Sequence, residues 1–240
     1  MKNYILHIGL PKTGTTALQA YYFPRLESSS VGYNPPSIVQ PLVEALKLLD
    51  FEMLTRNDLQ LLKEVVASQS ERIAQRTILI SLEILSQRLG RFNFIERANF
   101  LKSIFPNARI VLVLRYQPAL LRSLYLQFLH QNYFLTPEEV FLPFARQAFP
   151  ETDMWKKNMQ IDIKEWNYTE AIKYLRDIYN GQFRIYFYER FSKNLADLGK
   201  MVFSFSNQKH GDLPSGPLPR VNVSYDSLTA HLALYLSLVT

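Results

Sequence analysis

The stretch Tyr4–Gln19, with the sequence YILHIGLPKTGTTALQ, sets the interpretation of the whole chain. It begins with apolar, branched and aromatic residues, as in a strand that is buried on both faces. A loop bounded by Gly9 and Gly14 follows, and a helical pattern begins at Thr15. In this order, the loop amides and the positive end of the helix dipole converge on one point. The stretch therefore predicts a phosphate-binding loop.

The loop differs from the Walker A loop of nucleoside triphosphatases, which has the pattern G-x-x-x-x-G-K-[ST]. Gly9 and Gly14 keep the glycine spacing, but Thr15 stands where a Walker A loop has its lysine. The lysine of this loop is Lys12, between the two glycines. We expect Lys12 to place a positive charge beside the group being transferred and so to be catalytic.

The composition limits the possible chemistry. With 240 residues, of which 48% are hydrophobic, the chain can bury a substantial core, and we expect a single domain over residues 1–240. The lack of cysteine excludes a disulfide framework, a thiolate metal site and a cysteine nucleophile. The four histidines show no H-x-x-x-H spacing, so no metal site is expected.

The charge and the hydropathy pattern indicate the class of partner. A net charge of +6 favours anionic ligands, but lysine and arginine are dispersed, so no nucleic-acid partner is expected. No apolar run approaches the roughly 20 residues that span a bilayer. The first strand begins too near the N-terminus for a signal peptide. These features predict a cytoplasmic protein, of a kind we expect in bacteria.

Strand-like and helical patterns alternate along the chain, which is typical of a parallel sheet covered by helices. Short apolar runs predict strands at Tyr4–Ile8, Thr77–Leu82, Arg109–Leu114 and Phe183–Tyr188. Helical patterns cover Thr15–Arg25, Pro41–Leu49, Asp58–Arg76, Phe94–Phe105, Pro118–Gln131, Pro137–Phe149, Tyr168–Tyr179 and Leu195–Phe205. We therefore expect a three-layer α/β fold with a central parallel sheet.

A helix-rich block at about residues 136–180 interrupts this alternation, and we expect it to form a helical cap over the carboxyl edge of the sheet. Its start is marked by Thr136-Pro137-Glu138-Glu139, a capping box with proline in the first turn. Asn180-Gly181 ends the helix before the last strand. Residues Asn207–Arg220 are rich in glycine and proline, and they predict a surface loop that leads to a terminal amphipathic helix.

Ligands of an open parallel sheet bind at the carboxyl ends of its strands. The second expected strand brings Ser81 and Glu83 to this edge, and the third brings Arg115, with Ser123 on the helix that follows. A guanidinium grips phosphate oxygens in a fork while a hydroxyl donates from another direction. Arg115 and Ser123 are therefore candidates for binding a phosphate.

The string P-K-T-G-T-T at Pro11–Thr16 resembles the 5′-phosphosulfate loop of sulfotransferases that use 3′-phosphoadenosine 5′-phosphosulfate (PAPS). Those enzymes bind the 3′-phosphate with an arginine at a strand end and a serine on the next helix, at the spacing of Arg115 and Ser123. Tyr188-Glu189-Arg190-Phe191 is similar to the Y-E-x-L segment of the family, in which the glutamate is mostly structural. The resemblance implies a P-loop NTPase-like sulfotransferase fold with PAPS as donor, PAP as product and no metal.

The resemblance also implies the residues of the cofactor site. Lys12 would neutralise charge on the bridging oxygen. The amides of Thr13 to Thr16, together with the hydroxyls of Thr15 and Thr16, would hold the 5′-phosphate. The cofactor-binding residues would be Pro11, Lys12, Thr13, Gly14, Thr15, Thr16, Arg115 and Ser123. Arg220 lies in a segment similar to the one after which many bacterial members close the cofactor site, so it is a further possible contact.

An acceptor hydroxyl must lose its proton during transfer, which requires a general base. In cytosolic animal sulfotransferases, that base follows the strand that precedes the arginine-bearing one, where this chain has Ser81-Leu82-Glu83. We expect Glu83 to be the base and Ser81 to contact acceptor or cofactor; alternatively, Glu83 only occupies the first turn of a short helix. His130 either reaches the acceptor or interacts with its helix dipole, and His7 is expected to be a core histidine.

Family members with the H-I-G-x-x-K-T-G-T-T start commonly act on glycans, so the resemblance implies a hydroxyl acceptor on a carbohydrate or glycolipid. Two other functions stay open. A small-molecule kinase is favoured by the glycine frame and disfavoured by the position of Lys12 and the lack of an evident Walker B aspartate. A non-catalytic module that binds acidic polysaccharide or nucleic acid is favoured by the positive charge alone.

Overall fold

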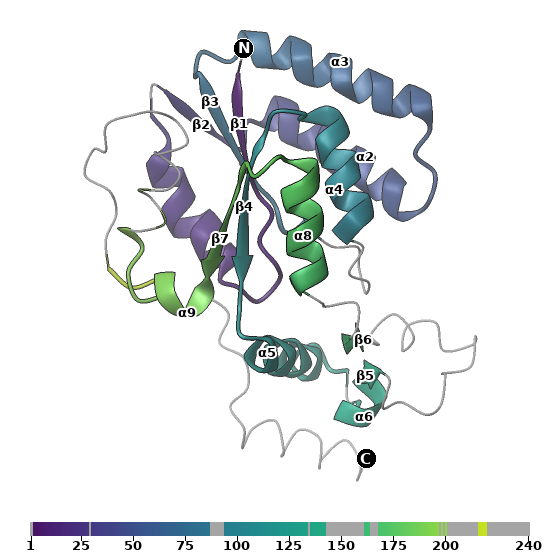
Figure 1. The fold of residues 1–240 in the computed structure, drawn as a ribbon, viewed down its shortest axis with the longest axis vertical. Coiled ribbons are helices and arrows are strands. Elements are labelled where there is room, and N and C mark those ends of the chain that lie inside the picture. The colour runs from purple at the N-terminus through teal and green to yellow at the C-terminus, as the bar shows by residue number, and fades with distance from the viewer. Residues whose placement is uncertain are drawn as a thin grey trace.

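The computed structural model describes residues 2–28, 30–86, 94–133, 135–142, 161–163, 168–196, 198, 200 and 216–219. These residues form a central sheet of five parallel strands in the order β2-β3-β1-β4-β7 (Figure 1). The strands are β1 (Asn3–His7), β2 (Val31–Tyr33), β3 (Thr77–Ser81), β4 (Arg109–Leu114) and β7 (Phe183–Phe187). The expected central parallel sheet is confirmed.

The sheet is apolar because both of its faces are covered. In β3, Ile78 and Ile80 belong to one apolar cluster and Leu79 to a second cluster on the opposite face. The side chains of β4 divide in the same way, with Ile110, Leu112 and Leu114 in the first cluster and Val111 and Val113 in the second. This division explains why the strands read as continuous apolar runs without polar alternation.

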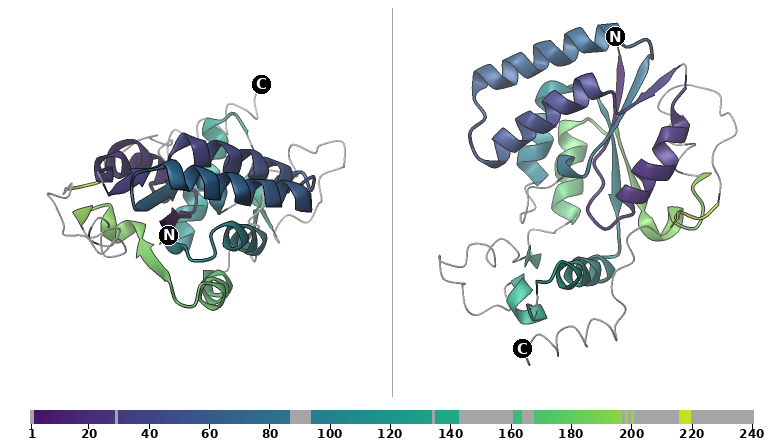
Figure 2. Two further views of the ribbon diagram at one scale, coloured as in Figure 1. Left: turned by 90° about the horizontal axis from the view of Figure 1, so that it is seen from above. Right: turned by 180° about the vertical axis from the view of Figure 1, so that it is seen from behind.

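One layer of helices covers each face of the sheet (Figure 2). The first cluster contains residues of α2 (Pro36–Asp50), α3 (Arg56–Arg72), α4 (Phe94–Ile104) and α8 (Tyr168–Ile178). The second contains residues of α1 (Thr15–Ala17), the π-helical turn η1 (Leu18–Tyr22), the 3₁₀ turn η2 (Phe23–Leu26) and α9 (Tyr188–Phe191). The three-layer α/β architecture is therefore confirmed.

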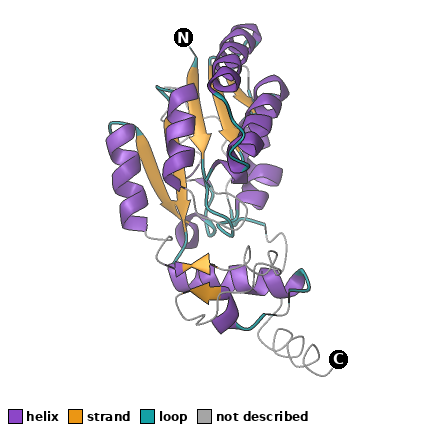
Figure 3. Ribbon diagram, turned by 90° about the vertical axis from the view of Figure 1, so that its right-hand side faces the viewer, coloured by secondary structure: helices purple, strands orange, loops and turns teal. Residues whose placement is uncertain are grey.

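A smaller group of elements lies beyond the carboxyl ends of the strands (Figure 3). It comprises α5 (Gln117–His130), α6 (Pro137–Val140) and the paired short strands β5 (Phe141–Leu142) and β6 (Ile161–Asp162). A cap at this edge was expected, and two of the helices predicted for it differ in the residues that the structure describes. The expected helix Pro137–Phe149 ends at Val140, because the next two residues pair with β6. The helix expected at Tyr168–Tyr179 packs on the sheet as α8 and is not part of the cap.

Other sequence predictions of elements need smaller corrections. Strand β2 was not expected, since it is only three residues long and contains Gly32. The helix expected from Pro41 begins already at Pro36. The helix expected at Thr15–Arg25 is instead a succession of α, π and 3₁₀ turns. Most of Leu195–Phe205, most of the predicted surface loop Asn207–Arg220 and the terminal helix after it lie outside the described residues.

The expected helix ends agree with the structure. Thr136 caps α6 in a capping box: its hydroxyl accepts from the Glu139 amide at 3.3 Å, and the Glu139 carboxylate accepts from the Thr136 amide at 2.7 Å. Asn180 and Gly181 both have positive φ, and the Gly181 amide donates to the Arg176 carbonyl at 3.1 Å. No helix in the described part of the chain combines the length and apolar character needed to cross a membrane.

Candidate functional site

The predicted phosphate loop follows β1 at the carboxyl edge of the sheet. Two residues hold the loop in left-handed conformations, Lys12 with φ 61° and Gly14 with φ 78°, and Gly14 caps α1. Gly9 is needed for close packing, since a Cβ there would lie 2.8 Å from His7 Nε2. A Cβ on Gly14 would lie 2.7 Å from Leu218 Cδ2. Both glycines are therefore required by the geometry of the loop.

The threonines of the loop have different tasks. Thr13 and Thr15 are buried, and both hydroxyls donate to the Leu10 carbonyl, at 2.5 and 3.3 Å. These two side chains hold the loop from inside, which does not support the expected phosphate contact of the Thr15 hydroxyl. Any phosphate contact of Thr13 and Thr15 would use their backbone amides. Thr16 is exposed, and its hydroxyl donates to Glu83 Oε1 at 3.2 Å.

Three predicted site residues gather around this loop. Lys12 is half-buried, and burial is the main cause that lowers the pKa of its ammonium. The charge of Glu83 raises the same pKa, and the charge of Arg115 lowers it. The fold therefore brings Glu83, just after β3, and Arg115, just after β4, within electrostatic reach of Lys12 in the loop after β1.

Arg115, at the carboxyl end of β4, contacts the loop directly. One of its terminal nitrogens donates to the Lys12 carbonyl at 2.8 Å, and its guanidinium carbon lies 4.8 Å from the centre of the Tyr188 ring. Its buried Nε has no hydrogen-bond partner among the described residues. Ser123 is half-buried on α5, the helix that follows Arg115. Its contact with a cofactor stays a prediction.

Ser81, the last residue of β3, is fully buried and held from three sides. Its hydroxyl lies 2.7 Å from Nδ1 of His7, and the side chain of Gln19 donates to its carbonyl at 2.9 Å and to its hydroxyl at 3.2 Å. The Asn34 side chain accepts from the Ser81 amide at 2.8 Å and donates to its carbonyl at 3.1 Å. The Ser81 hydroxyl thus points into the core, which does not support the expected contact with acceptor or cofactor.

His7 is a buried core histidine, as expected from its place in the strand. Burial lowers the pKa of its imidazole to about 3, so the ring is neutral at physiological pH. Only Nδ1 has a hydrogen-bond partner among the described residues; Nε2 faces Gly9. The histidine therefore fills the space under the loop.

Glu83 begins the short 3₁₀ turn η3 (Glu83–Leu85), which is tied to the loop at its far end. The buried Ser86 hydroxyl donates to the Gly9 carbonyl at 2.9 Å and to the Glu83 carbonyl at 3.2 Å. The Ser81 contacts before this turn and the Ser86 contacts after it fix Glu83 against Thr16 of the loop. The carboxylate thus lies at the loop, within electrostatic reach of Lys12, while its role as a base stays a prediction.

The remaining expected residues are less closely tied to the loop. Glu189 accepts from the Tyr116 amide at 3.0 Å, at the start of α5, which agrees with a structural role for this glutamate. His130 is exposed at the end of α5, and its contact with an acceptor stays a prediction. Arg220 lies outside the described residues, but Leu218 just before it is buried against the loop at Gly14.

Sequence reasoning assigned no role to Tyr188, Gln19 and Asn34, three residues that hold the site together. Tyr188 packs against both Arg115 and Gly14, and Gln19 and Asn34 hold Ser81. Asn34 has φ 41°, a conformation that asparagine tolerates better than most residues, and the Asn-Pro pair after β2 was a usable turn signal. Gln19 carried no such signal, because its partner is distant in the sequence.

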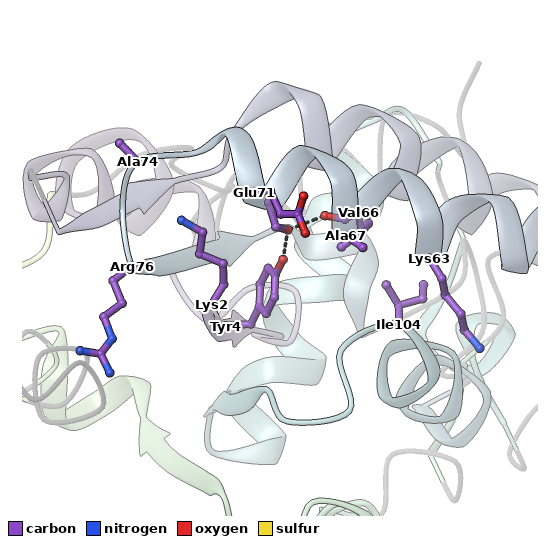
Figure 4. A pocket seen from close by; sticks show the side chains of 10 residues that line it. Lys2, Tyr4, Lys63, Val66, Ala67, Glu71, Ala74, Arg76 and Ile104 are labelled. Atoms are coloured by element: carbon purple, nitrogen blue, oxygen red, sulfur yellow. Dashed lines mark hydrogen bonds between the residues drawn. The ribbon is translucent and has the colours of Figure 1, made fainter.

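The described residues contain no group of three or more histidine, aspartate or glutamate side chains placed to hold a metal ion. A hollow of about 650 Å³ lies at the opposite, amino edge of the sheet (Figure 4). Its groups do not converge on a ligand: Lys63 and Arg76 lie at opposite ends, and Lys2 donates to the Gln75 carbonyl at 2.8 Å. The carboxyl edge is therefore the better candidate site.

Comparison with known proteins supports the fold. Neither the models of known protein families nor the sequences of curated proteins match this chain. Among solved structures, a sulfotransferase from Alicyclobacillus acidocaldarius is similar over 100% of this chain and 96% of its own, with a TM-score of 0.53 and 13% sequence identity. The chain thus shares the P-loop-like α/β fold of that sulfotransferase.

Proposed function

We propose that this protein is a PAPS-dependent sulfotransferase, which moves the sulfuryl group of PAPS to an acceptor hydroxyl and releases PAP. The observation that carries the proposal is the contact between Arg115 and the Lys12 carbonyl at 2.8 Å. It joins the arginine predicted to bind the 3′-phosphate to the loop predicted to bind the 5′-phosphosulfate. The fold shared with a known sulfotransferase agrees with this function.

The residues at the carboxyl edge fit such a cofactor. The loop before α1 has the left-handed residues and small side chains that let amides face an anion. The hydroxyls of Thr13 and Thr15 donate to the Leu10 carbonyl instead. The unpartnered buried Nε of Arg115 and the half-buried Lys12 add positive charge beside it. PAPS would supply the activated sulfuryl group, held by residues 11–16, Arg115 and Ser123.

The side chains of Lys12 and Glu83 would stabilise the leaving group and activate the acceptor. The Lys12 ammonium would neutralise charge that grows on the leaving phosphate, an interaction that is strengthened by its partial burial. Glu83 would take the proton of the acceptor hydroxyl, because it is the carboxylate fixed beside the loop at Thr16. These groups would hold donor and acceptor in line, and such positioning also dominates the related phosphoryl transfers. No resident metal is part of the proposed site.

We further propose that the acceptor is a carbohydrate or glycolipid hydroxyl and that the protein acts in a bacterial cytoplasm. The support for the acceptor is the H-I-G-x-x-K-T-G-T-T start alone. A panel of sugars, glycolipids and phenols, each incubated with PAPS and followed by mass spectrometry, tests it. Transfer to phenols and to no sugar would overturn this part of the proposal.

A comparison of ligands tests the reaction class. PAP should raise the melting temperature more than ADP or AMP, because only PAP carries a 3′-phosphate for Arg115 and Ser123. At 100 times its dissociation constant, a ligand adds about 2.7 kcal/mol to the free energy of unfolding, which is readily detected. Stabilisation by ADP or ATP with Mg²⁺ but not by PAP would indicate a kinase. Binding of polyanions that falls steeply with salt and ignores nucleotides would indicate a non-catalytic module.

A further inference from the structure

Lys12 is held in an unusual conformation. Its φ of 61° lies in the left-handed region, which residues other than glycine, asparagine and aspartate rarely adopt. Such a conformation persists where surrounding contacts over-determine it. Among the described residues, the Arg115 guanidinium donates a hydrogen bond to the Lys12 carbonyl at 2.8 Å and so constrains the Lys12 peptide.

Arg115 is itself fixed from several directions, which lets it serve as an anchor. Its guanidinium packs on the Tyr188 ring, with 4.8 Å between the guanidinium carbon and the ring centre. Its carbonyl accepts from the Tyr168 hydroxyl at 3.0 Å, and the next amide, of Tyr116, donates to Glu189 at 3.0 Å. The arginine therefore has little freedom to follow a moving loop, and the loop conforms to the arginine.

We propose that Arg115 is a positioning residue for Lys12, in addition to its predicted contact with the 3′-phosphate. By holding the Lys12 carbonyl, it orients the peptide between Lys12 and Thr13, and with it the amides that face the 5′-phosphate and the ammonium of Lys12. This inference rests on the proposed function. It goes further in one respect, because it assigns Arg115 an effect on ligands that carry no 3′-phosphate at all.

The distinguishing experiment combines Arg115 variants with ligands that have and lack the 3′-phosphate. Arg115→Lys keeps the positive charge but loses the planar fork that reaches the carbonyl and a phosphate together. Calorimetry should show that it weakens binding of PAP and also weakens binding of AMP, by about fivefold or more. Arg122→Lys, an exposed arginine on α5, is the matched control and should change neither affinity. If AMP binding by Arg115→Lys equals that of the wild type, Arg115 does not position the loop.

A double-mutant cycle isolates the backbone contribution. Glycine adopts positive φ without strain, so a Lys12→Gly loop should keep its conformation without the anchor. In the Lys12→Gly background, Arg115→Lys should no longer weaken AMP binding but should still weaken PAP binding. An unchanged loss of AMP affinity in this background would show that the effect does not pass through the Lys12 conformation.

Turnover provides an independent measurement. Adenosine 5′-phosphosulfate carries the sulfuryl group but no 3′-phosphate. If Arg115 only bound the 3′-phosphate, replacing it would not change turnover with this donor. We expect Arg115→Lys to lower kcat with this donor as well as with PAPS. If the variant and the wild type have the same kcat with adenosine 5′-phosphosulfate, the positioning role is contradicted. Circular dichroism confirms that each variant is folded, and Arg115→Gln repeats the binding measurements if Arg115→Lys is not. If the wild type transfers no sulfuryl group, the proposed function fails, while the AMP measurements still decide the positioning role.

Discussion

Replacing Glu83 with glutamine tests the proposed chemistry with little disturbance of the structure. The new side chain has nearly the same shape, and its amide oxygen can still accept from the Thr16 hydroxyl, as Glu83 Oε1 does at 3.2 Å. The turn η3 stays tied to the loop by the Ser86 hydroxyl, which donates to the Gly9 carbonyl. Fold and loop should therefore be unchanged, while the proton acceptor and its negative charge are lost.

The expected loss is the contribution of a positioned general base. Such a base accelerates a reaction by roughly 10²–10⁴-fold, so kcat should fall by about 10²-fold or more, equivalent to about 2.7 kcal/mol of transition-state stabilisation. The variant also removes the negative charge that raises the pKa of Lys12 against burial and Arg115. With a lower pKa, the Lys12 ammonium deprotonates at lower pH. The alkaline limb of the residual activity should therefore move to lower pH.

The assay measures kcat and KM with PAPS and a responsive acceptor across neutral and alkaline pH, together with PAP affinity by calorimetry. PAP affinity should change little, because Glu83 is expected to act on the acceptor. Glu71→Gln, an exposed glutamate on α3, serves as the control. Turnover close to that of the wild type would refute Glu83 as the base. If His130→Ala abolishes turnover instead, His130 takes that role.

Three further predictions concern the loop and its support. Lys12→Ala should remove most turnover but leave the PAP dissociation constant within about tenfold, since the ammonium acts mainly in the transition state; near-normal kcat would make Lys12 only a binding residue. Burial lowers the pKa of His7 from 6.5 to about 3, so between these pH values the unfolded chain binds a proton at His7 that the folded chain does not. This histidine should therefore lower the free energy of unfolding by about 1.4 kcal/mol for each pH unit below 6.5. Calorimetry should show this decline, and His7→Gln should reduce it. Gly14→Ala should weaken PAP binding and lower the melting temperature, because a Cβ at φ 78° would lie 2.7 Å from Leu218; wild-type values for both would contradict the loop geometry.

The sequence by itself determined the elements whose signals are local. The four predicted strands recur within a residue at each end, because an apolar run buried on both faces is visible without knowing its partners. The glycine spacing of the loop, the capping box at Thr136 and the Asn180-Gly181 helix end are likewise fixed by neighbouring residues. The placement of Glu83 and Arg115 at one sheet edge followed from strand ends in a parallel sheet.

The tertiary structure alone decided how these residues are held. Arg115 and the Lys12 carbonyl meet across a separation of 103 residues, and Gln19 and Ser81 across 62, and no local pattern encodes either contact. Strand β2 owes its existence to β3, since its three residues have no strong propensity of their own. In the described part of the cap, the helix predicted from Pro137 ends at Val140, because Phe141 and Leu142 pair with the distant strand β6.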